Sequence, residues 1–214
     1  MRKHDLVIFD WNGTLQDDLH HIYECGVERI FRHFGLPCPT LEQYRHAVAA
    51  DFMIFYRDHG VPADVTAQDL NAIMGEGFKE KGRPADLFPD AASTVAALRG
   101  RGYPLALASG YDSSKLAAAV ARGGLAPAFF RIDGDVRDKA ATFASIIAEA
   151  GASPDRTAVI GDTVEDVLGA SAVGATPYIC TRGFHPVERI EATRGDAPSL
   201  VIVGSLEELD PHFP

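Results

Sequence analysis

Short runs of apolar residues recur along the chain, separated by longer mixed segments. The runs cover residues 6–9, 105–108, 157–160, 177–180 and 200–203. They are too short for buried helices and do not alternate between apolar and polar positions, which is typical of strands buried on both faces of a sheet. The pattern therefore predicts a sheet that is covered on both sides.

Helical periodicity characterises most of the segments between and after these runs. The segments that show it are 90–100, 113–122, 139–150, 164–173 and 185–193. An alternation of strands and helices implies parallel strands joined by crossover helices. We therefore expect an α/β fold with a doubly wound parallel sheet.

Residues 17–82 interrupt this alternation, because they show helical spacing and no convincing buried strand. The residues of this pattern are Ile22, Cys25, Gly26, Arg29, Ile30, Ala47, Ala50 and Ile54. An inserted all-helical cap domain at 17–82 is the simplest account, with a core domain formed by 1–16 and 83–214. Two prolines restrict the backbone where the chain returns, and Leu87 with Phe88 is expected to pin it to the core.

Composition and charge narrow the class of protein. Of the 214 residues, 46% are hydrophobic and 23% are charged, as in an ordinary soluble globular protein. The formal net charge is -10. Proteins that bind nucleic acid need a clustered excess of Lys and Arg, so we expect no nucleic-acid partner.

The cysteines and the N-terminal residues indicate the cellular compartment of the protein. Cys25, Cys38 and Cys180 are odd in number and widely spaced, which predicts neither a disulfide framework nor a zinc site. The polar N-terminus leads directly into the first strand, and no apolar run approaches membrane-spanning length. The sequence therefore predicts a cytoplasmic protein with no membrane partner, and it specifies no oligomeric state.

Small, polar and acidic residues follow three of the predicted strands. They are Asp10-Trp11-Asn12-Gly13-Thr14, then Ser109-Gly110, then Gly161-Asp162 with Asp166 four positions later. Ligands of open parallel sheets bind beyond the carboxyl ends of the strands. We therefore expect the functional site at this edge.

Each of these residues taken alone has a structural explanation. Asp10 and Asp162 could cap a turn or a helix, and Ser109 could cap the helix predicted from 113. Caps do not explain why three carboxylates should converge, since their repulsion raises their pKa values unless a cation is present. A cluster of oxygen ligands without His or Cys favours Mg2+.

The four segments together resemble the motifs of haloacid dehalogenase-like hydrolases. The matching residues, in the family's order, are Asp10-Trp11-Asn12-Gly13-Thr14, Ser109, Lys139 and Gly161-Asp162-x-x-x-Asp166. Residues 87–91 and 201–209 also resemble the phosphoglycolate-phosphatase-like branch, which carries a helical cap between the first two motifs. The resemblance implies a Mg2+-dependent phosphatase that acts on a small phosphorylated metabolite, such as phosphoglycolate or a sugar phosphate.

The resemblance also implies a role for each residue. Asp10 would attack phosphorus to form an aspartyl-phosphate that water hydrolyses, and it would bind Mg2+ with the backbone carbonyl of Asn12 and the Asp162 carboxylate. Asp166 would support the metal through water or hydrogen bonds. The remaining assignments concern the substrate: Ser109 and Lys139 would hold phosphate oxygens, and Trp11, Gly13, Thr14 and Gly110 would line the site, with Trp11 in its wall.

Asn12 departs from the family's pattern, in which the residue two beyond the nucleophile is a second Asp. That Asp protonates the leaving oxygen and later activates water. An amide does neither, so a contribution of roughly a hundred to ten-thousandfold should be largely missing. The metal site need not suffer, because the family uses the backbone carbonyl at this position.

Asn12 is compatible with several kinds of activity. The protein could be a slow phosphatase, could act on substrates with good leaving groups such as acyl phosphates, or could bind a phosphate ligand without turnover. It could also borrow an acid from Asp17, Asp18, His20 or His21, or regain one if the Asn12-Gly13 pair deamidates.

Two other reactions known in the family fit less well. A dehalogenase does not need the acidic cluster of Asp162 and Asp166. A phosphonatase needs a cap lysine for a Schiff base, and Lys79 and Lys81 have the sequence setting of solvated charges.

Overall fold

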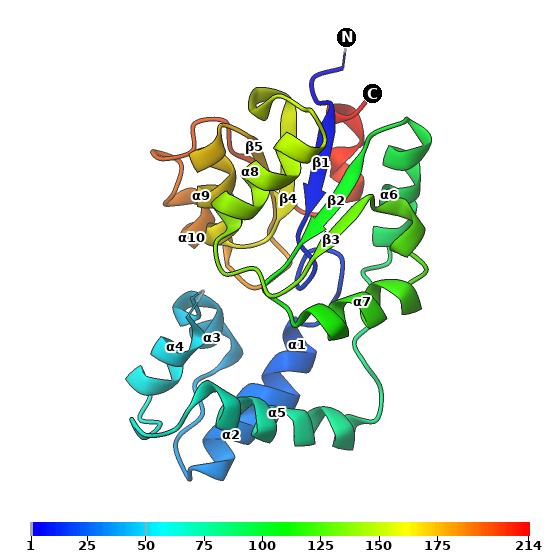
Figure 1. Ribbon diagram of the computed structural model, residues 1–214. Coiled ribbons are helices and arrows are strands. Elements are labelled where there is room, and N and C mark those ends of the chain that lie inside the picture. The colour runs from blue at the N-terminus through cyan, green and yellow to red at the C-terminus, as the bar shows by residue number, and fades with distance from the viewer. Residues whose placement is uncertain (1, 50) are drawn as a thin grey trace. The chain divides into compact units, whose positions relative to one another are not determined.

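The chain forms two units, which the computed structural model describes over residues 2–49 and 51–214 (Figure 1). One unit comprises residues 1–16 and 87–214, and the other comprises 17–86. Ala50, which belonged to the predicted helical pattern, lies outside the described residues.

A six-stranded sheet forms the centre of the first unit. Its strands are β1 (Leu6–Phe9), β2 (Leu105–Ala108), β3 (Arg131–Asp133), β4 (Thr157–Gly161), β5 (Thr176–Cys180) and β6 (Val201–Val203). The order is β3-β2-β1-β4-β5-β6, and every neighbouring pair is parallel. The predicted doubly wound parallel sheet is confirmed.

The sequence predicted all of these strands except β3. This strand spans only three residues, two of them charged, and all three are partly exposed at the sheet edge. An edge strand needs no continuous apolar run, because it is not buried on both faces. The apolar pattern therefore gave no signal at β3.

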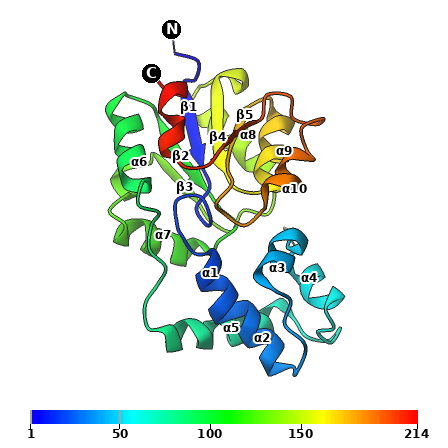
Figure 2. The same ribbon diagram turned by 180° about the vertical axis from the view of Figure 1, so that it is seen from behind.

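Helices cover both faces of the sheet, as Figures 1 and 2 show. They are α6 (Ala91–Gly100), α7 (Ser113–Arg122), α8 (Lys139–Glu149), α9 (Val164–Val173) and α10 (Val187–Glu191), with short 3-10 turns η2 (Ala126–Ala128), η3 (Pro154–Arg156) and η4 (Glu207–His212). Successive residues of a strand point to opposite faces. Val7 and Phe9 accordingly pack with α6, α7 and η4, whereas Leu6 and Ile8 pack with α8 and α9.

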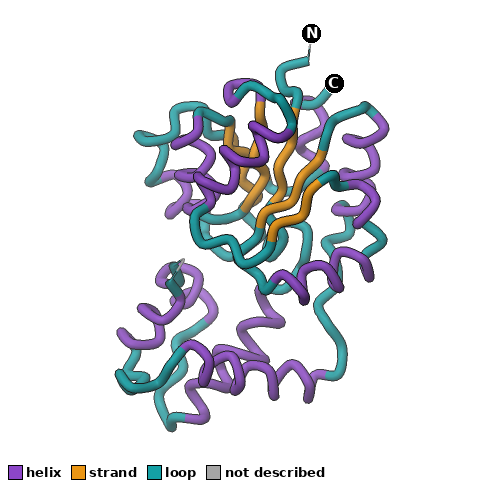
Figure 3. Tube along the Cα trace, in the orientation of Figure 1, coloured by secondary structure: helices purple, strands orange, loops and turns teal. Residues whose placement is uncertain are grey.

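The second unit contains only helices and loops among its described residues (Figure 3). Its elements are α1 (Leu19–Ile22), a π-helical segment η1 (Tyr23–Val27), α2 (Glu28–His33), α3 (Leu41–Ala47), α4 (Phe52–Asp58) and α5 (Ala67–Lys81). The expected periodicity through Ala47 and Ile54 is wrong, because α3 ends at Ala47 and both side chains are exposed. Tyr44 and Phe55 form the buried contact there instead.

The chain crosses between the units at residues 16–17 and 86–87. Gln16 and Leu87 form an isolated antiparallel bridge, and the Phe88 N–H donates to the Leu15 carbonyl at 3.0 Å. Phe88 is buried in the core of the first unit. These contacts put the return to the sheet unit at residue 87, four residues beyond the predicted position at 83.

All three cysteines are free thiols, and Cys25 and Cys180 are buried. Within the described parts of the chain, no helix combines the length and apolar character that a membrane span requires.

Candidate active site

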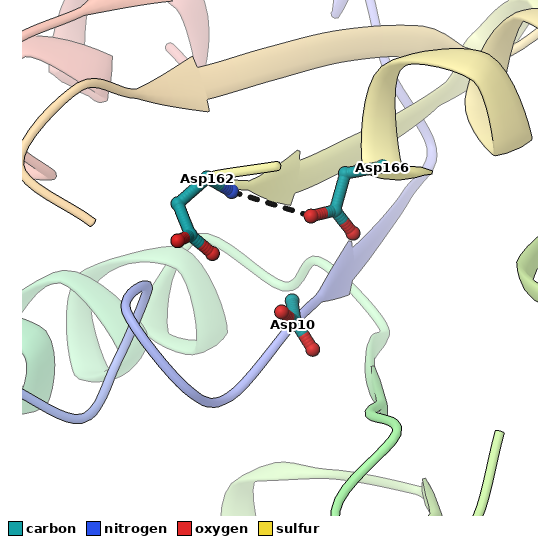
Figure 4. Close-up of side chains that lie close together, drawn as sticks. All are labelled: Asp10, Asp162 and Asp166. Carbon is teal, nitrogen blue, oxygen red and sulfur yellow. Dashed lines mark hydrogen bonds between the residues drawn. The ribbon is translucent and has the colours of Figure 1, made fainter. Parts of the chain in front are cut away.

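Three buried carboxylates meet at the carboxyl ends of two neighbouring strands. Asp10 follows β1, and Asp162 and Asp166 follow β4, which pairs with β1 in parallel register. One oxygen from each carboxylate lies within 4.8 Å of the others. Figure 4 shows the three side chains converging, as expected from strands that end at the same edge.

Asp166 is held by two kinds of contact. One oxygen, Oδ2, accepts hydrogen bonds from the Thr163 hydroxyl at 2.6 Å and from the Thr163 and Asp162 backbone N–H groups. Thr163 and Asp166 thereby form a capping box at the start of α9. The other oxygen, Oδ1, accepts from the Lys139 ammonium at 2.5 Å.

Asp162 is fixed by a hydroxyl and a backbone donor. The Thr14 hydroxyl donates to Oδ1 at 3.0 Å, and the Phe184 N–H donates to Oδ2 at 2.6 Å. Gly13 and Gly183 pack against the same carboxylate so closely that a Cβ at either position would overlap Oδ2. The carboxylate therefore has little freedom to rotate.

Asp10 is held less completely than its neighbours. Its backbone N–H donates to the Ile160 carbonyl at 2.8 Å, and Oδ2 lies 3.3 Å from the Lys139 ammonium. The buried Oδ1 atom has no hydrogen-bond partner. A buried oxygen without a partner costs free energy, and a bound cation or a reacting group would satisfy it.

Burial and mutual repulsion raise the pKa values of the first two carboxyls. Burial raises the pKa of Asp10 to about 6, although Lys139 opposes the shift. Burial and the nearby Asp10 and Asp166 raise the pKa of Asp162 well above its ordinary value. Burial lowers the pKa of Lys139, but Asp10 and Asp166 outweigh this effect and keep it above the ordinary value.

The raised pKa of Asp10 predicts how metal-free stability depends on pH. A carboxyl whose pKa rises from 3.8 to about 6 on folding contributes stability that is present below pH 3.8 and lost as the pH rises through 6. The loss is up to about 3 kcal/mol. We expect urea unfolding in a chelator to show Asp10→Asn gaining stability over the wild type between pH 4.5 and pH 7.5.

Comparing the two proteins isolates Asp10 from other groups. The pKa of His4 is lowered to about 4, chiefly by burial, so its contribution changes with pH in the opposite sense, but it is present in both proteins. Saturating Mg2+ should reverse the order of stabilities at pH 7.5. A difference that stays constant across this pH range would contradict the prediction.

Ser109 and Asn12 lie together beside the carboxylates. The Ser109 hydroxyl donates to the Asn12 side-chain oxygen at 3.3 Å and accepts from the Tyr111 N–H at the same distance. Ser109 is buried, whereas Asn12 is partly exposed and Gly110 is exposed. A serine hydroxyl, a flexible glycine backbone and the Lys139 ammonium are groups that suit phosphate oxygens.

Of the residues expected to line the substrate site, Trp11 lies in the core, whereas Gly13 and Thr14 contact the Asp162 carboxylate. Trp11 is not in the site wall: it is fully buried in the core, and its indole N–H donates to Gln16 at 2.8 Å. Thr14 is buried and donates to Asp162, and the Gly13 N–H donates to the Gln16 carbonyl. The turn after β1 closes on the Trp11 carbonyl, which accepts from the Thr14, Leu15 and Gln16 N–H groups.

The loop after β5, residues 181–186, also contributes to the site, which the sequence did not predict. Gly183 and Phe184 of this loop contact Asp162, and His185 accepts a hydrogen bond from the Val164 N–H at the start of α9. Small and polar residues follow the run at 177–180 as they follow the other runs, and this is the signal in the sequence that points to the loop.

The two lysines considered for a Schiff base are ion-paired in the helical unit. Lys79 lies 2.7 Å from Glu76, and Lys81 lies 2.7 Å from Glu24. The hydrogen bond to Glu24 raises the pKa of Lys81. Schiff-base chemistry needs a lysine whose pKa is lowered, so the phosphonatase alternative gains no support.

The parallel fold and the acidic cluster agree with the protein family that the sequence matches. The family model for haloacid dehalogenase-like hydrolases matches residues 4–174, so the chain belongs to this family of hydrolases. The predicted similarity to its phosphoglycolate-phosphatase-like branch is also confirmed by individual relatives.

Two of these relatives are phosphoglycolate phosphatases. One, from Pseudomonas putida, is 27% identical over 92% of this chain and 75% of its own. The other, from Aliivibrio fischeri, is 25% identical over 91% of both chains. A solved structure of a predicted phosphatase from Clostridium acetobutylicum has the same fold, with a TM-score of 0.78, 22% identity and 97% of both chains covered.

Proposed function

We propose that this hydrolase is a Mg2+-dependent phosphatase that uses Asp10 as its nucleophile. The observation that carries the proposal is the unpartnered, buried Asp10 Oδ1 beside Asp162, Asp166 and Lys139. A nucleophilic carboxylate must keep one oxygen free for phosphorus. The family membership and the phosphoglycolate phosphatase relatives support the same reaction class.

The donor set suits a hard divalent cation. Asp10 and Asp162 would be direct ligands with the Asn12 backbone carbonyl, and both supply only oxygen atoms. The Lys139 ammonium already lies against Asp166, whereas the donors to Asp162 among the described residues are uncharged, which supports an indirect role for Asp166. Mg2+ at this position would neutralise charge on the transferring phosphoryl group.

The substrate we propose is a small phosphorylated metabolite, with phosphoglycolate and sugar phosphates as the first candidates. Lys139 and Ser109 would bind the equatorial phosphoryl oxygens, and Lys139 would also keep Asp10 ionised for attack. The aspartyl-phosphate formed on Asp10 would then be hydrolysed by water. The names of two relatives, both phosphoglycolate phosphatases, support phosphoglycolate among these candidates.

One observation favours a second candidate, a protein that binds a phosphate ligand without turnover. Asn12 stands beside Ser109, where the family pattern has an acid, and an amide cannot transfer the proton. A panel assay with phosphomonoesters, acyl phosphates and pyrophosphate, each with Mg2+ and with a chelator, separates the two candidates. Mg2+-dependent hydrolysis supports the phosphatase, and phosphate binding without any hydrolysis supports the binder.

We expect Asn12→Asp to accelerate hydrolysis of phosphomonoesters by about a hundred to ten-thousandfold, because it restores a group that can protonate the leaving oxygen. Acyl phosphates should gain little, since their leaving groups need no proton. Steady-state kcat on both substrate classes measures the difference.

The matched control for this change is Asn71→Asp, at an exposed position of α5. It should leave the hydrolysis rates of both substrate classes unchanged. Mass spectrometry of the Asn12 peptide must show no gain of one dalton in the wild type, since deamidation would mimic the variant. Equal acceleration of both substrate classes would contradict the proton-transfer explanation.

A further inference from the structure

The loop that holds Asp162 is itself held by a buried ion pair. Arg182 forms a bidentate pair with Asp90, with distances of 2.9 and 2.6 Å from its two terminal nitrogens to the two carboxylate oxygens. Asp90 is 6% exposed, and the Arg182 side chain is 21% exposed. Two parallel charge-assisted hydrogen bonds fix orientation as well as distance.

The Asp90 carboxylate pairs with Arg182 and does not cap the helix that follows it. It occupies the N-cap position of α6, yet its side chain makes no capping hydrogen bond. One of its oxygens, Oδ2, also accepts from the Leu206 N–H at 2.9 Å. An aspartate at this position ordinarily caps the helix. Asp90 instead binds two residues that are distant in the sequence.

The Arg182 guanidinium also stacks on Phe88, 3.8 Å from the ring centroid. Phe88 is the residue whose N–H pairs with the Leu15 carbonyl, at the end of the segment that begins with Asp10. Arg182 thus holds together the loop after β5, the return segment at 87–90 and, through Phe88, the segment after β1. Stacking and bidentate pairing are both specific to arginine.

The residues directly after Arg182 contact the metal-site carboxylate. Gly183 packs on Asp162 without room for a Cβ, and the Phe184 N–H donates to its Oδ2 at 2.6 Å. Gly183 lies one residue after Arg182 and Phe184 lies two residues after it. A shift of the Arg182 backbone would therefore move both contacts with Asp162.

We infer that Arg182 is a positioning residue for the metal site, which acts through its pair with Asp90 to fix the loop that orients the Asp162 carboxylate. The inference rests on the proposed metal-binding function. Groups that orient a metal ligand commonly change metal affinity by ten to a hundredfold when they are altered. They need not change the rate once the metal site is saturated.

The test uses Arg182→Lys in the full chain, with Mn2+ as a spectroscopic substitute for Mg2+. Lysine keeps the charge but cannot pair with both oxygens or stack in the same way. Electron paramagnetic resonance of free Mn2+ should show a dissociation constant about tenfold higher than in the wild type. In parallel, the Mg2+ concentration for half-maximal hydrolysis should rise by a similar factor while kcat at saturating Mg2+ stays within about threefold.

Arg194→Lys is the matched control. Arg194 also makes a bidentate pair, with Glu191, but on an exposed part of the same unit. It should leave the Mn2+ dissociation constant unchanged. Gly183→Ala, which disturbs the loop directly, should weaken Mn2+ binding at least as much as Arg182→Lys.

The outcomes separate this inference from the proposed function. Weaker Mn2+ binding in Arg182→Lys supports it even if the wild type hydrolyses nothing in the panel, in which case only the catalytic proposal fails. If Arg182→Lys does not fold, Asp90→Asn replaces it, because its single amide oxygen can still accept from the Leu206 N–H while the bidentate pair with Arg182 is lost. An unchanged dissociation constant in a folded variant, or a wild type that binds no Mn2+, overturns the inference.

Discussion

Replacing Asp10 by Asn is expected to lower Mg2+-dependent phosphatase activity by at least about a thousandfold. The amide is a poor nucleophile for phosphorus and a weak metal ligand, so both proposed roles of the carboxylate are lost together. The loss should appear in kcat with the best substrate of the panel at saturating Mg2+. It should not reflect unfolding, because the metal-free variant is expected to be the more stable protein at pH 7.5.

Asp196→Asn provides the matched control for this change. Asp196 is an exposed aspartate of the same unit, and the same loss of charge there should leave kcat unchanged. Rapid quenching with a radiolabelled phosphate ester gives a second readout, since the wild type should carry acid-stable label on Asp10 and the variant should carry none. Activity that persists in Asp10→Asn would remove this residue from the nucleophile's role.

The second large effect is expected from Lys139→Met. Lys139 joins two buried carboxylates, at 2.5 Å from Asp166 and 3.3 Å from Asp10, and the methionine keeps much of its volume. Removing one partner of a buried charge cluster costs about 3 kcal/mol or more, because the remaining charges are left uncompensated. We therefore expect lower stability in urea without metal, together with a loss of kcat of at least about a hundredfold.

A double variant separates these two consequences. Lys139→Met combined with Asp166→Asn removes one charge of each sign, and the new amide oxygen can still accept from Thr163. Stability should recover in part, whereas activity should stay low because the phosphate has lost its cation. Lys115→Met, on the exposed face of α7, should change neither quantity by a measurable amount.

Asn12 gives the proposed active site an unusual balance between binding and turnover. Its neighbours retain the carboxylates for a metal and the cation for phosphate, while the position that would deliver a proton holds an amide. A site of this kind should discriminate between substrates by the acidity of the leaving group more than a site with a second acid does. The comparison of phosphomonoesters with acyl phosphates addresses this difference directly.

The sequence alone determined the class of fold and the edge of the sheet where the proposed site lies. Runs such as 6–9 and 157–160 are apolar without alternation because both faces of a central parallel strand are covered. The burial of such a strand can therefore be predicted from its own residues. Acidic residues directly after such runs, such as Asp10 and Asp162, must then lie at a common edge. Both inferences depend only on neighbours in the chain.

Tertiary structure decided the contacts that orient these residues. Lys139 pairs with Asp166, the Phe184 N–H donates to Asp162, and Arg182 pairs with Asp90. The two partners of these contacts lie 27, 22 and 92 residues apart in the sequence. The burial of Trp11 likewise depends on its packing in the core of the folded unit and on its hydrogen bond to Gln16. Such contacts depend on strand order and loop geometry, which place distant residues together without leaving a periodic pattern in the sequence.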